Sequence, residues 1–80
     1  MIEENLYHIW LKMPLDKIEK TLALFACETI DCQQQVIHML MSGENTINEI
    51  KFDITYNNML AWREMYECML NIKLLKKRDI

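Results

Sequence analysis

The sequence predicts an all-α protein, either a helical hairpin or a three-helix bundle with two long antiparallel helices. The 80 residues include one Gly and one Pro, too few turn-forming residues for the repeated chain reversals of a β protein. Apolar residues also recur at alternating spacings of three and four, which is the period of a packed helix face. A chain of this length forms one domain, residues 1–80.

Pro14 marks the boundary between the first two predicted helices. The residue before a proline is pushed away from the α region, whereas proline itself suits the first turn of a helix. We therefore expect helices at 2–12 and 14–42, and Gly43 can adopt the left-handed conformation that ends the second one. The stripe that predicts this second helix consists of Leu15, Ile18, Leu22, Phe25, Thr29, Cys32, Val36 and Met39.

The segment after Gly43 predicts a short capped element, 46–53, followed by a last helix at 55–77. Residues 46–49, Thr-Ile-Asn-Glu, match the capping box that starts many helices. Ile47, Ile50 and Ile54 share a helix face that lies about 150–180° from the later apolar stripe. One straight helix could not bury both faces against one neighbour, so we expect a break near 53–55. Alternation from Ile50 to Tyr56 leaves a short extended stretch as the alternative.

The segment ACETIDCQQQVIH, residues 26–38, raises the possibility of a metal site. In a helix, Cys27 and Cys32 point about 140° apart, and His38 lies about 16 Å beyond Cys27 along the axis. Zinc ligands lie about 2.0–2.3 Å from the metal, so these three residues cannot share one ion. We expect no metal site.

The sequence predicts no catalytic site and no cofactor. A single Gly excludes a Gly-rich phosphate-binding loop, and no zinc-protease or nucleophile-elbow pattern occurs. His38 has Ser42 at helical contact spacing, but no third group orients the pair. We therefore expect that the protein is not an enzyme.

Charge and cysteine content favour a soluble cytoplasmic protein. The formal net charge is −3, and three cysteines cannot all pair as disulfides. The first residues lack the basic start and apolar run of a secretory signal. No apolar run approaches the ~18–20 residues of a membrane span.

The apolar content predicts a partner chain. Hydrophobic residues make up 51% of the sequence, and they include seven Met and two Trp. This is more apolar surface than a small domain readily buries. We therefore expect a non-catalytic helical protein-protein interaction module of the adaptor, co-chaperone or antagonist type, which dimerises or packs against a partner helix in a homodimer or hetero-complex. The residues predicted to bind the partner are Tyr7, Trp10, Met59, Trp62, Met65, Tyr66 and Met69.

A small DNA-binding transcriptional regulator is the alternative function. Its contacts with phosphate would come from the basic C-terminal end, which comprises Lys73, Lys76, Lys77 and Arg78. Positive charge at this position also complements the dipole of the last helix, which explains the cluster without any ligand. Phosphate neutralisation dominates affinity for nucleic acid, so the acidic net charge argues against such a partner.

Overall fold

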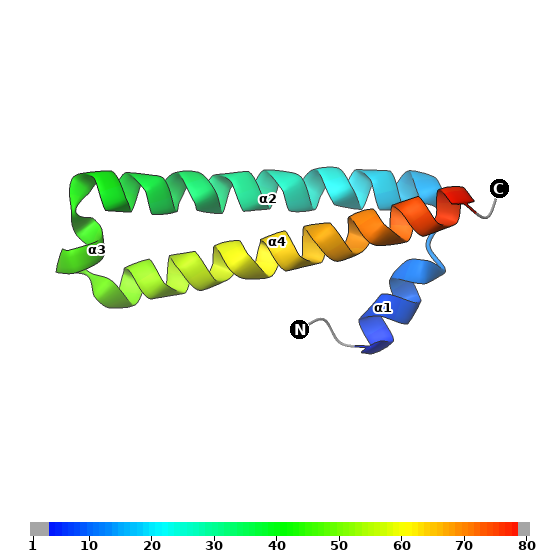
Figure 1. Cartoon of the computed structure of the whole chain (residues 1–80), viewed down its shortest axis with the longest axis horizontal. Coiled ribbons are helices and arrows are strands. Elements are labelled where there is room, and N and C mark those ends of the chain that lie inside the picture. The colour runs from blue at the N-terminus through cyan, green and yellow to red at the C-terminus, as the bar shows by residue number, and fades with distance from the viewer. Residues whose placement is uncertain (1–3, 79–80) are drawn as a thin grey trace.

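The chain folds as a helical hairpin with a short helix packed at its open end (Figure 1). The computed structural model describes residues 4–78, and these contain α1 (Glu4–Leu11), α2 (Leu15–Ser42), α3 (Glu44–Ile47) and α4 (Glu49–Arg78). The two long helices, α2 and α4, run antiparallel and pack along each other. The predicted all-α hairpin with two long antiparallel helices is therefore confirmed.

The first helix boundaries differ little from those predicted. Helix α1 ends at Leu11, and residues 2 and 3 of the predicted 2–12 helix lie outside the described residues. Pro14 has an extended backbone, with φ −60° and ψ 148°, so it precedes α2 as its N-cap instead of forming its first residue. Gly43 ends α2 in the left-handed conformation, with φ 77°, as the sequence predicted.

The predicted break near 53–55 is wrong, and so is the extended alternative, because α4 is continuous from Glu49. Asn48, with φ −131° and ψ 74°, precedes it, and the Asn48 Oδ1 accepts a 3.1 Å hydrogen bond from the backbone N–H of Lys51. Thr46 does not cap this helix, since its hydroxyl donates to the Gly43 carbonyl at 2.8 Å. The capping box predicted over 46–49 therefore does not form, and Asn48 fulfils the capping role.

The hydrophobic core lies in one half of the hairpin. We call residues 4–29 and 62–78 the terminal half, and residues 30–61 the loop half. The buried core cluster lies wholly in the terminal half and consists of Trp10, Ile18, Leu22, Phe25, Met69 and Ile72. The Phe25 ring packs beside two indoles, with its centroid 5.7 Å from that of Trp10 and 5.8 Å from that of Trp62. The loop half contributes only Val36 and Met39 to the buried apolar residues of the described chain.

Candidate interaction surface

The structure separates the predicted partner-binding residues into two groups. Trp10 and Met69 are 6% and 0% exposed, so both belong to the chain's own core and cannot touch a partner unless the fold opens. Trp10 packs from α1 against Phe25 of α2, and Met69 of α4 lies in the same buried cluster, so the chain itself covers both side chains. The others are half-buried beside or near this core: Tyr7, Met59, Trp62, Met65 and Tyr66.

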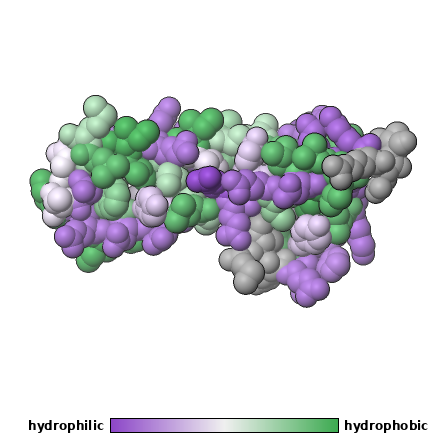
Figure 2. Space-filling view, in the orientation of Figure 1, coloured by the Kyte–Doolittle hydropathy of each residue, from purple (hydrophilic) through white to green (hydrophobic). Residues whose placement is uncertain are grey.

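The most exposed large apolar side chains lie at the other end of the hairpin. Met41, Ile47 and Ile50 are 84%, 83% and 75% exposed, and Ile54 follows one turn after Ile50. We call Ile47, Ile50 and Ile54 the loop-end patch, because they follow one another through α3 and the first turns of α4. Figure 2 shows hydrophobic side chains gathered at this end of the molecule. The isoleucine spacing is visible in the sequence, but the change of helix face there predicts a break that does not occur.

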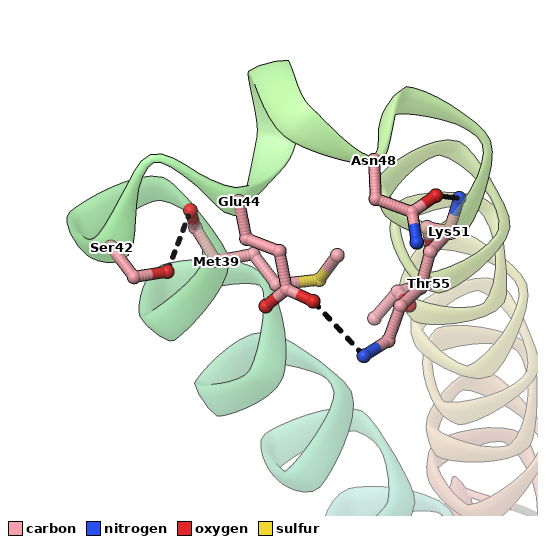
Figure 3. A network of polar contacts seen from close by, with 6 residues as sticks. All are labelled: Met39, Ser42, Glu44, Asn48, Lys51 and Thr55. Carbon is pink, nitrogen blue, oxygen red and sulfur yellow. Dashed lines mark hydrogen bonds and ion pairs between the residues drawn. The ribbon is translucent and has the colours of Figure 1, made fainter.

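Polar contacts hold the backbone beneath the loop-end patch (Figure 3). Lys51 Nζ lies 3.1 Å from Glu44 Oε1, which joins α4 to α3. The backbone N–H of the same lysine donates to Asn48, and the Ser42 hydroxyl donates to the Met39 carbonyl at 3.3 Å. The exposed ion pair contributes about 0–1 kcal/mol, and the cap about 1 kcal/mol. The patch is therefore displayed on an ordered turn.

A second apolar surface runs along α2. We call it the α2 stripe, and its residues are Ala26, Ile30, Gln33, Ile37 and Leu40. At 100° per residue the stripe lies about 80° around α2 from the core-facing residues. Ile30, Ile37 and Leu40 are each about half exposed. A shallow hollow of about 210 Å³ beside the stripe is lined by Ala26, Thr29, Ile30 and Tyr66, so Tyr66 of α4 borders the same surface.

The side of α2 that carries the α2 stripe has no charged side chains between Thr21 and Gly43. Between Thr21 and Gly43 the only Asp, Glu, Lys or Arg residues are Glu28 and Asp31. At 100° per residue both lie on the opposite flank of α2 from the stripe. Depletion of charge with retained apolar residues is the composition of an interface core.

A polar groove lies on that opposite flank, close to the loop end. It has a volume of about 400 Å³ and is lined by Asp31, Gln34, Gln35, His38, Met39, Glu44 and Lys51. Glu44 and Lys51 engage each other across it. Within residues 4–78, no group of three or more His, Cys, Asp or Glu side chains is placed to hold a metal ion.

The three cysteines are free thiols in different surroundings. Cys27 is exposed, whereas Cys32 and Cys68 are half-buried. Burial raises the pKa of the Cys32 thiol, and the carboxylates of Glu28 and Asp31 raise it further. Burial, with a smaller effect of Glu64, also raises the pKa of Cys68. Both half-buried thiols are therefore held in the neutral form that suits a partly apolar environment.

The basic C-terminal end is tied partly to α2. Lys73 Nζ lies 3.6 Å from Glu19 Oε1, an ion pair that links the end of α4 to the start of α2. Lys76 is half-buried and Lys77 is exposed, while the side chain of Arg78 lies outside the described part of the chain. None of the described helices is long and apolar enough to cross a membrane.

Comparison with protein families, with curated protein sequences and with solved structures found no match to this chain.

Proposed function

We propose that this chain is a non-catalytic protein-protein interaction module that binds an apolar partner helix through the loop-end patch. The observation that carries the proposal is the exposure of Ile47 and Ile50, at 83% and 75%, on a hairpin whose other half is well packed. Exposed apolar patches of this kind mark sites of interaction with proteins.

The geometry of the patch suits a helix as its partner. Ile50 and Ile54 lie one turn apart on α4, so they form a short ridge against which an amphipathic helix can pack, and the exposed Ile47 lies just before this helix. Fully burying one such side chain is worth roughly 1.5–3 kcal/mol. Because the turn beneath the patch is already ordered, binding requires little loss of backbone freedom there.

Site-specific crosslinking in the native host tests this function. A photoreactive residue placed at Ile50 or at Ile47 should trap the same partner protein, because both positions belong to the loop-end patch. A photoreactive residue at Asn71, an exposed α4 position in the other half of the hairpin, is the control.

A second variant separates specific binding from general stickiness. Ile50→Ser combined with Ile54→Ser should abolish the crosslink from Ile47, whereas Leu24→Ser, which removes a half-exposed leucine elsewhere, should leave it unchanged. Equal crosslinking from Ile50 and Asn71, or a crosslink that survives the double substitution, would rule out the loop-end patch as the binding surface.

A further inference from the structure

We propose that a second copy of this chain packs antiparallel on the α2 stripe, so that two hairpins form a four-helix bundle. The inference rests on the proposed role in protein-protein interaction and names one partner for it. It uses a surface other than the loop-end patch, so that the two proposals can fail separately.

The spacing of the stripe is that of a helix-packing seam. Its five residues are separated by four, three, four and three positions, which is the repeat that lets two helices pack along each other at a shallow angle. The core-facing stripe of α2 has the same alternation and is covered by α4. Helix α2 therefore carries two seams, one filled by its own chain and one open.

The open seam is complementary to itself in the antiparallel direction. If the two-fold axis lies between Gln33 and Gln34, Ile30 faces Ile37 of the second copy. The same register places Ala26, the smallest residue of the stripe, opposite the large and exposed Met41. Gln33 then faces Gln34 of the second copy, and a pair of amides can both donate and accept hydrogen bonds.

The charge distribution also favours the antiparallel arrangement. Residues 12–20 and 73–77, at the open end of the hairpin (Figure 1), carry six lysines against Asp16 and Glu19. Residues 21–72 carry seven acidic residues against Lys51 and Arg63. An antiparallel second copy brings the basic end of each chain toward the acidic part of the other, whereas a parallel copy brings like charges together.

The exposed area fits a small, reversible dimer. A Leu, Ile or Met side chain has roughly 100 Å² of apolar surface. Ile30, Ile37, Leu40 and Met41 are 50%, 54%, 52% and 84% exposed, and Met59 and Tyr66, which share one face of α4, add their exposed parts. Each copy therefore offers on the order of 300 Å², and two copies approach the roughly 700 Å² of apolar surface in the smallest stable interfaces.

Mass measurement in solution tests the dimer. Light scattering on the size-separated wild-type chain should give twice the 9.7 kDa of one chain at high protein concentration and fall toward that value on dilution. Ile37→Glu should give the single-chain mass at every concentration, because it buries a charge in the seam. Leu24→Glu is the matched control, since Leu24 is a half-exposed residue of the same helix outside the stripe, and it should remain dimeric. Circular dichroism should show the same helicity for all three proteins.

Disulfide trapping tests the orientation in a background where Cys27, Cys32 and Cys68 are serine. A mixture of Ala26→Cys and Met41→Cys chains should form a mixed disulfide dimer, while each variant alone should not. Self-crosslinking of Ala26→Cys would overturn the antiparallel arrangement.

The dimer and the proposed function can fail separately. A wild-type chain that has the mass of one chain at all concentrations would overturn the dimer, and crosslinking at Ile50 to another protein would then still support the proposed function. If the dimer forms but no crosslink to another protein is found at Ile50, the dimer is supported and the proposed function is not.

Discussion

Asn48 determines where the last helix begins. The sequence predicts Thr46 as a cap, with Glu49 three residues later, and does not single out the asparagine between them. In the structure Thr46 lies within α3, where its hydroxyl bonds to the Gly43 carbonyl. Asn48 has the non-helical backbone that an N-cap needs. Sequence pattern alone could not decide this, because the choice depends on a four-residue helix that no periodicity signals.

Replacing Asn48 by Ala should lower the free energy of unfolding by about 0.5–2 kcal/mol, because the N–H of Lys51 loses its acceptor. Asn57→Ala is the matched control, since Asn57 is an exposed residue inside α4 and Ala is the better helix former there. Urea unfolding followed by circular dichroism measures both. Equal effects of the two substitutions would contradict the capping role.

The cysteines should differ in their rates of alkylation. The thiolate is the reactive form, so a raised pKa and burial both slow the reaction. Cys27 is exposed and should react first with iodoacetamide near neutral pH, while Cys32 and Cys68 should lag. Because their pKa values are raised, the lag should shrink as the pH rises. Peptide mapping by mass spectrometry measures the three rates, and a Cys32 rate equal to that of Cys27 would show that α2 opens there.

Helix α2 was predictable from the sequence and the start of α4 was not, for a physical reason. In α2, one continuous stripe of apolar residues faces one neighbour over the whole length, and Gly43 ends it. In α4, two apolar faces point in different directions, and the prediction assumed that both must be buried. The structure instead keeps the helix continuous and leaves Ile50 and Ile54 exposed.

The two faces of α2 should respond differently to truncation. Leu22 is 7% exposed within the core cluster, and Leu22→Ala should cost about 2–5 kcal/mol through lost burial and a cavity. Leu24 is 55% exposed on the same helix, and Leu24→Ala should change stability by no more than about 0.5 kcal/mol. Thermal melting of the two variants compares them. An unchanged melting curve for Leu22→Ala would mean that this face is not the packing face.

Taken as a whole molecule, the hairpin is packed unevenly. Helix α1 adds Trp10 to the terminal half, where it meets Phe25, whereas the loop half has only the four-residue α3 across its end. The sequence indicated surplus apolar residues, and it placed them on α4 around Trp62 and Met69. Their true location depends on which end of the hairpin α1 covers, and local periodicity carries no information about this.

This uneven packing has a measurable consequence for amide hydrogen exchange. Residues 18–25 lie beside the buried cluster, while residues 30–41 bury only Val36 and Met39 and should therefore open at lower free energy in the single chain. A second copy on the α2 stripe would suppress that opening by mass action. Exchange at 30–41 should therefore be slow in concentrated wild-type protein and accelerate on dilution, while exchange at 18–25 changes much less. In the Ile37→Glu variant, exchange at 30–41 should be fast at every concentration. Exchange at 30–41 could instead be slow and unaffected by dilution and by this substitution. That result would mean that the single chain alone stabilises the loop half, without a second copy on the α2 stripe.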